Sequence, residues 1–131
     1  MKAKTLLISL SLILTCVFCY GQAPEITGGS KADRDSLART SILIRAAFSR
    51  GDVDGIMKYH HPDVIKALSY KNYQRGANTV RSGIAETLKE YRLDFTGNDL
   101  ESLYINGNTA VEQTLFTIQG TLKVADSRSP S

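Results

Sequence analysis

The chain has 131 residues, of which 42% are hydrophobic, and a formal net charge of +3 at pH 7. This length is typical of one globular domain with its own apolar core. The lysines and arginines are scattered along the chain, which argues against a nucleic-acid partner, because binding to phosphates needs clustered basic residues.

Residues 1–21 are typical of a secretory signal peptide. Two lysines precede an uncharged apolar run over 6–18, and small residues favour cleavage after Gly21. Cleavage removes both cysteines and lowers the formal charge from +3 to +1, so the mature chain of 110 residues (131 − 21) forms no disulfide. A retained anchor and a lipidated cysteine are the less favoured alternatives. We predict a secreted or periplasmic protein without stable membrane insertion.

Residues 22–32 contain glycines, a proline and few large apolar groups, which predicts a flexible leader. The domain is expected to begin near Asp33 with a helix that runs to Arg50 and ends at Gly51. Its apolar residues recur at helical spacing: Leu37, Leu43, Ile44, Ala47 and Phe48.

A second, short helix is predicted over 53–60, with Asp52 as its N-cap and Pro62 preventing its continuation. The following residues 63–70 are predicted to form a strand, and 71–78 a turn.

A third helix is predicted to begin after Asn78, as its cap, and to reach residue 90. Val80, Ile84 and Leu88 repeat at four-residue intervals within it. This single apolar stripe predicts that the helix packs against a flat layer.

The last part of the chain has strand patterns over 92–97, 100–105 and 109–120, with a break at 97–99 between the first two. Asn106-Gly107 favours a tight hairpin turn, since both residue types tolerate a positive φ. Residues 123–131 are small and polar and are expected to be a frayed tail.

The run IRAAFSRGDVDGIMKYHHPDVIKAL, with the later GNTAVEQTLFTIQG, resembles the NTF2-like superfamily, and more closely its SnoaL-like and DUF4440-type secreted bacterial members. The resemblance covers residues 33–122. It implies an α+β, cystatin-like cone in which N-terminal helices pack on a curved antiparallel sheet and enclose an apolar cavity. Ketosteroid isomerase and scytalone dehydratase use this cavity as an active site, and other relatives hold ligands or dimerise.

The sequence departs from the family pattern at its end. Family domains usually continue into further long strands, the last of which pairs with the early strand region. The chain stops at Ser131, so we expect the last strands to be missing and residues 63–70 to lack a partner. We favour a shortened version of a longer protein over a sheet that another chain completes.

The motif His60-His61-Pro62-Asp63 is a weak metal signal. Adjacent positions on a helix point about 100° apart, so the two histidines do not easily bind one ion. We therefore predict no metal site, and the sequence indicates no cofactor.

Catalytic candidates follow from the resemblance and from one strand. The isomerase relative places a carboxylate base on the early strand region, but residues 67–76 contain no Asp or Glu. The dehydratase relatives use a His and Asp pair, which makes His60 and Asp63 candidates. Glu112 is a third, because it shares a strand face with Phe116 and would need a partner or a raised pKa if that face were buried. An exposed Glu112 at the strand end is the favoured alternative.

The predicted function is to hold a small apolar ligand or a partner chain, without a demonstrable catalytic set. One alternative is an isomerase, dehydratase or cyclase that uses the same cavity, and another is a structural module that forms a homodimer through its sheet. The residues predicted to line the cavity are Phe48, Tyr59, His60, Tyr70, Val80, Ile84 and Phe116.

Overall fold

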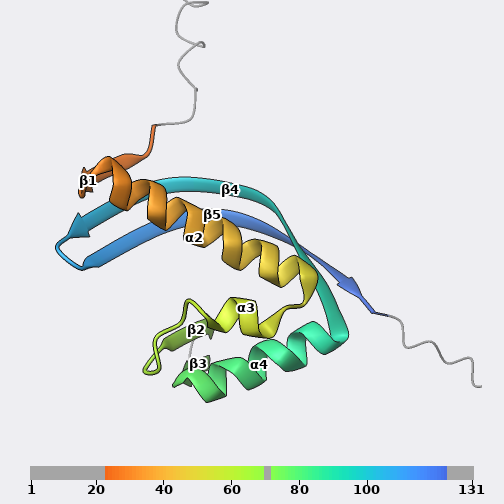
Figure 1. Ribbon diagram of the computed structural model, residues 1–131. Coiled ribbons are helices and arrows are strands. Elements are labelled where there is room, and N and C mark those ends of the chain that lie inside the picture. Colours follow the sequence, from red (N-terminus) through yellow and green to blue (C-terminus); the bar gives the residue numbers. More distant parts are fainter. Residues whose placement is uncertain (1–22, 70–71, 124–131) are drawn as a thin grey trace, which may run out of the picture.

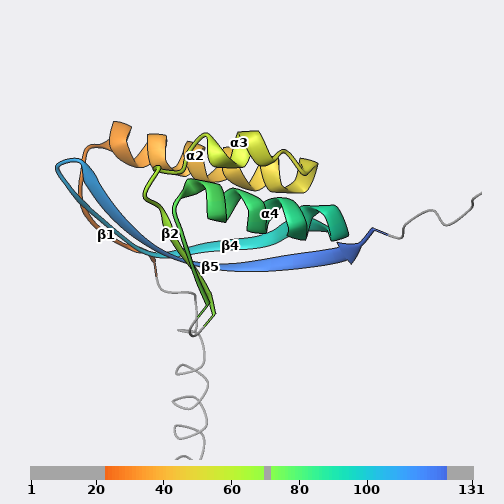
Figure 2. The same cartoon turned by 90° about the horizontal axis from the view of Figure 1, so that it is seen from below.

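A computed structural model describes residues 23–69 and 72–123 and shows an α+β fold in which helices cover one face of a curved sheet (Figures 1 and 2). The predicted signal peptide, Tyr70 and all but the first residue of the predicted tail lie outside the described residues. In chain order the elements are β1 (Glu25–Gly28), α2 (Lys31–Arg50), α3 (Val53–Met57), β2 (Ile65–Ser69), β3 (Asn72–Arg75), α4 (Ala77–Glu90), β4 (Tyr91–Asn106) and β5 (Thr109–Leu122).

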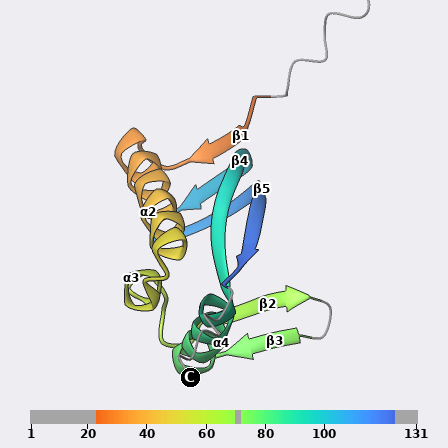
Figure 3. The same cartoon turned by 90° about the vertical axis from the view of Figure 1, so that its right-hand side faces the viewer.

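The strands form two separate sheets. The larger has the order β1-β4-β5, with β4 and β5 antiparallel and β1 parallel to β4, so it is mixed rather than purely antiparallel. The smaller is the antiparallel β2-β3 hairpin, which lies beside α4 (Figure 3). Residues 63–70 were predicted to lack a partner, but β3 pairs with β2 along one edge. The predicted turn over 71–78 therefore contains a strand.

The long hairpin β4-β5 has its turn where it was predicted, but the two turn residues are Gly107, at φ 55°, and Asn108, because Asn106 is the last residue of β4 and pairs with Thr109. The predicted break at 97–99 is wrong, because β4 runs without interruption from Tyr91 to Asn106. The pairing register shifts at Thr96 and again at Glu101 instead. Each shift is a β-bulge, in which one extra residue bends the strand while the ladder continues.

The bulges decide which β4 side chains face the helices. Before the first bulge these are Leu93 and Phe95, between the bulges Asn98, and after the second Leu103 and Ile105. Because strand side chains alternate between faces, each extra residue shifts the inward set by one position.

The segment predicted to be a flexible leader contains ordered structure. Residues 25–28 form β1, and Ser30 begins α2 with a capping box. The backbone N–H of Asp33 donates to Ser30 Oγ at 3.2 Å, and the backbone N–H of Ser30 donates to Asp33 Oδ2 at 2.8 Å. This satisfies two backbone donors at the helix start.

The two later helices differ from the prediction at their ends. Asp52 caps α3 as expected, accepting from the Gly55 backbone N–H at 2.8 Å, but α3 ends at Met57 rather than at 60. At the start of α4 the N-cap is Gly76 rather than Asn78, with φ 80° and no side-chain cap bond. A positive φ at this position favours glycine.

The core lies between the helices and extends to β4. Its buried members are Ala47, Ile56, Met57, Val80, Ile84 and Leu88. The stripe predicted on the third helix supplies half of them. Leu43, predicted on the apolar side of the first helix, is 44% exposed. Because α2 and α4 also contact β4, the helices hold the sheet at the distance that leaves a cavity beneath them.

Candidate functional site

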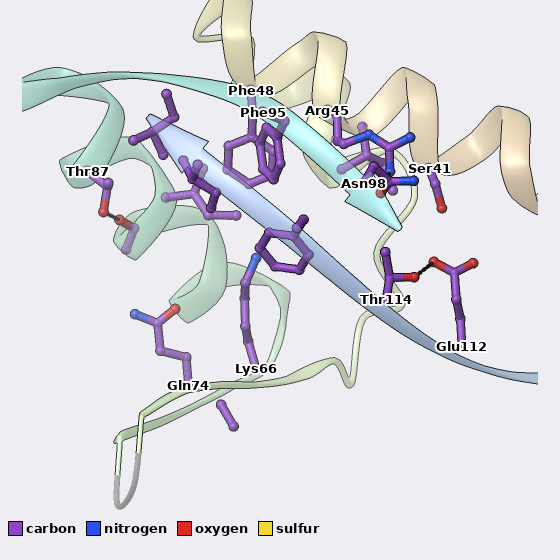
Figure 4. Close-up of a pocket in the computed structure, with 17 residues that line it drawn as sticks. Ser41, Arg45, Phe48, Lys66, Gln74, Thr87, Phe95, Asn98, Glu112 and Thr114 are labelled. Carbon is purple, nitrogen blue, oxygen red and sulfur yellow. Dashed lines mark hydrogen bonds between the residues drawn. The ribbon is translucent and has the colours of Figure 1, made fainter. Parts of the chain in front are cut away.

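A cavity of about 560 Å³ lies where α2, α4, the β2-β3 hairpin and the β4-β5 hairpin approach one another (Figure 4). Its size falls within the range of about 300–1,000 Å³ that is usual for small-molecule sites. The residues that line it are Ser41, Ile44, Arg45, Phe48, Lys66, Ala67, Gln74, Gly83, Ile84, Thr87, Leu93, Phe95, Asn98, Glu112, Thr114, Phe116 and Ile118.

Aromatic rings form one continuous wall of the cavity. The ring centroids of Phe48 and Phe95 are 5.6 Å apart, and those of Phe95 and Phe116 are 5.7 Å apart, both pairs tilted. Such tilted pairs stabilise the arrangement of the rings beyond the burial of their area. The three rings come from α2, β4 and β5, so the wall joins the helical layer to the sheet.

Secondary-structure periodicity explains which side chains reach the cavity. On α2, Ser41, Ile44, Arg45 and Phe48 follow the i, i+3, i+4, i+7 spacing of one helix face. On β5, alternate residues from 112 to 118 line the cavity, as expected for one face of a strand.

The polar groups of the sheet side are already paired. Arg45 Nη1 donates to Asn98 Oδ1 at 2.7 Å, which links α2 to β4. Thr114 Oγ1 donates to Glu112 Oε1 at 2.7 Å on β5. These bonds fix the orientation of the four side chains at the cavity wall.

Lys66 is the polar residue that reaches the aromatic wall from the opposite side. It stands on β2, and its Nζ lies 5.4 Å from the centroid of the Phe48 ring. Burial lowers the pKa of the Lys66 amine below its usual 10.5, because a partly desolvated ammonium loses hydration. The position over the ring face offsets part of this cost through a cation–π contact.

Three of the residues predicted to line the cavity do so: Phe48, Ile84 and Phe116. Val80 does not, because it is fully buried in the helical core, where it contacts other apolar side chains. Tyr70 lies outside the described residues.

Tyr59, His60 and Asp63 lie away from the cavity lining. The His60 ring nitrogen Nδ1 is 2.9 Å from the Ile56 carbonyl oxygen, so the ring is held against its own helical turn. Asp63 is exposed and lies next to His61, whose Nδ1 accepts from the Asp63 backbone N–H at 3.1 Å. The structure therefore does not bring His60 and Asp63 together with Glu112.

The structure agrees in part with each of the two alternatives predicted for Glu112, the buried and the exposed one. The Phe116 face of β5 does line the cavity, and Glu112 belongs to it, but its side chain is exposed and bonded to Thr114. The structure therefore does not bury Glu112 among apolar neighbours, which was the condition for its role as a catalytic candidate.

Sequence reasoning missed Lys66, Arg45 and Asn98. One usable signal was the single lysine inside the apolar strand run that follows Asp63, where a charged residue must face either solvent or a cavity. Asn98 gave no signal, because its inward position depends on the bulge at Thr96.

Within the described residues, no group of three or more His, Cys, Asp or Glu side chains is arranged to hold a metal ion. Over the same residues, no helix has the length and apolar character needed to cross a membrane.

Comparison with known proteins places the fold. No protein-family model matches the sequence, and no curated protein matches it. Among solved structures, the chain is similar to the crystal structure of a "putative polyketide cyclase" from Xanthomonas campestris pv. campestris, with a TM-score of 0.56 and 17% sequence identity over 75% of this chain and 70% of that one. The fold is therefore an NTF2-like α+β fold of the kind found in SnoaL-like proteins.

Proposed function

We propose that this chain binds a small, largely apolar molecule in the cavity between its helices and its sheet. The observation that carries the proposal is a cavity of about 560 Å³ with three phenylalanine rings along one wall and a few polar side chains around it. Apolar walls with few polar groups are the usual composition of ligand sites.

The test uses Nile red, a neutral dye that fluoresces in apolar sites, and two neighbouring residues of β5. Phe116 lines the cavity and Leu115 faces the other side of the sheet, yet both are half-exposed, at 54% and 64%. Phe116→Ala should weaken dye binding by about tenfold, because it removes a large apolar contact. Leu115→Ala should leave binding unchanged. Equal losses in both variants would place the dye on the sheet surface and contradict the proposal.

A second candidate is catalysis of the cyclase type in the same cavity. It is supported by the fold that the chain shares with the crystal structure described as a putative polyketide cyclase, and by an amine and a carboxylate, Lys66 and Glu112, in one cavity. Turnover of a bound polyketide-like substrate by the wild type, lost in a Lys66→Met variant, would favour this function over binding alone.

A third candidate is homodimerisation through the outer face of the β4-β5 hairpin. Its support is a group of exposed apolar side chains there, Tyr104, Val111 and Leu115, which are 50%, 62% and 64% exposed. Size measurement over a range of concentrations tests it, and a monomer at all concentrations would contradict it.

Secretion is proposed from the signal-peptide pattern of residues 1–21. Sequencing the N-terminus of the exported protein tests this proposal, with Gln22 expected as the first residue after cleavage. An N-terminus at Met1 in the cell fraction would contradict it.

A further inference from the structure

Lys66 lies at the meeting point of the cavity's apolar and polar parts. It belongs to β2, which pairs with β3, and its side chain runs from this hairpin towards the part of the cavity where Phe48 and Phe95 lie (Figure 4). Its Nζ is 5.4 Å from the Phe48 ring centroid. An ammonium group is therefore held beside the apolar wall on which a ligand would rest.

Lys66 has no charge partner in the described part of the chain. Over residues 23–69 and 72–123, no carboxylate oxygen lies within 4.0 Å of its Nζ. The one carboxylate that lines the cavity, Glu112, is bonded to Thr114. Most buried or half-buried charges in proteins are paired, so an unpaired one at a cavity wall indicates a place for an external partner.

The charges around the cavity favour an anion. Two cations, Arg45 and Lys66, and one carboxylate, Glu112, line it, which leaves a formal charge of +1. Arg45 uses one of its donors on Asn98, whereas Lys66 Nζ donates to no group among the described residues and lies beside the aromatic wall. Desolvation lowers the pKa of this amine, and a carboxylate bound to it would restore much of the stabilisation that the ammonium loses on leaving water.

We propose that the cavity takes an apolar carboxylate, a hydrocarbon chain or ring system with one carboxyl group, whose carboxylate accepts hydrogen bonds from Lys66 Nζ while its body lies against Phe48, Phe95 and Phe116. This proposal rests on the proposed binding function and names the class of ligand for it. Lys66 determines specificity by recognising the head group, and the aromatic wall supplies most of the contact area.

The experiment compares two ligands of equal chain length, dodecanoate and dodecan-1-ol, below their aggregation concentrations. Their affinities are measured by displacement of Nile red from the wild type and from Lys66→Met, which keeps the length of the side chain and removes the charge. Dodecanoate should bind about tenfold more weakly to Lys66→Met, the usual effect of losing a charge-assisted hydrogen bond. Dodecan-1-ol should bind both proteins with similar affinity.

Two further variants serve as controls. Lys89→Met removes an exposed lysine of α4 that does not line the cavity and should change neither affinity. Lys66→Arg keeps a cation and should retain more dodecanoate affinity than Lys66→Met. Binding of Nile red itself and the thermal unfolding midpoint report that each variant is folded.

The outcomes separate this proposal from the proposed function. If the wild type binds both ligands and Lys66→Met binds both unchanged, or loses both equally, head-group recognition by Lys66 is wrong while binding in the cavity stands. If the wild type binds the dye but neither ligand displaces it, the apolar carboxylate proposal fails while the proposed function stands, and if the dye itself does not bind the wild type, both proposals fail. Loss of dodecanoate binding alone in Lys66→Met supports both.

Discussion

The helical layer and strand β5 differ sharply in how they use apolar residues. Ile56 and Val80, on α3 and α4, are 0% exposed, whereas none of the 14 residues of β5 is buried. Leu115 and Phe116 of β5 are 64% and 54% exposed. Burial of apolar area is the main source of stability. The helical layer and β4 therefore stabilise the fold, and the inner side chains of β5 remain accessible for contact with other molecules.

The largest expected effect comes from the buried helical layer. Ile56→Ala should lower the free energy of unfolding by about 3 kcal/mol, because it leaves a cavity in a close-packed core. Ile42→Ala is the matched control on a helix surface, since Ile42 is 58% exposed, and should cost less than about 0.5 kcal/mol. Urea denaturation measures both. Similar losses of stability in the two variants would contradict the view that the buried helical residues supply most of the stability.

A smaller effect is expected at the start of α2. Ser30→Ala removes the oxygen that accepts from the Asp33 backbone N–H and should lower the free energy of unfolding by about 1 kcal/mol. Ser36→Ala, inside the same helix on an exposed position, should be neutral or slightly stabilising because alanine is the better helix former. If Ser30→Ala were equally neutral in thermal unfolding, α2 would not depend on its capping box.

On strand β5, Phe116→Ala should lower the free energy of unfolding by less than about 1 kcal/mol, although it removes more atoms than Ile56→Ala. The Phe116 ring is already half-exposed and packs against Phe95. Its removal therefore loses little buried apolar area. The same urea experiment measures it. A loss equal to that of Ile56→Ala would show that β5 is part of the core, and the stabilising region would then include the whole sheet.

The smallest effect is a pH dependence from Lys66. Its pKa in the folded protein lies below 10.5, the usual value expected for the unfolded chain. Between the two values the unfolded state binds more protons, so the free energy of unfolding rises with pH through that window. The wild type should gain stability relative to Lys66→Met as the pH rises towards 10.5. A relative loss over the same range would mean that the ammonium is stabilised by folding, contrary to its burial.

Much of the helical layer could be predicted from sequence, because the apolar residues of α4 repeat at four-residue intervals and Asp52 and Gly51 mark helix ends. The position of the hairpin turn at Gly107 was equally clear, although the turn begins one residue later than the predicted Asn-Gly pair. Strand β1 could not be predicted, since its four residues carry no alternating pattern and depend on pairing with β4. Lys66, as a cavity residue, depends on how the β2-β3 hairpin sits against α4. Local patterns contain no information about such contacts between distant segments.

The bulged residues Thr96 and Glu101 have a consequence for how sequences of this fold change. Removing Thr96 alone would leave the ladder in phase, because Gly97 would then follow Phe95 directly and keep its pairing with Thr117, and Asn98 would stay on the side of Arg45. The strand would lose only the bend that the extra residue causes. A loss of Glu101 would act in the same way, because Leu100 and Ser102 already pair with the consecutive residues Thr114 and Gln113. Deletion of either bulged residue should therefore preserve the inward side chains of β4. An alignment that counts alternation straight through β4 would exchange inward and outward positions between the two bulges and be correct again beyond the second.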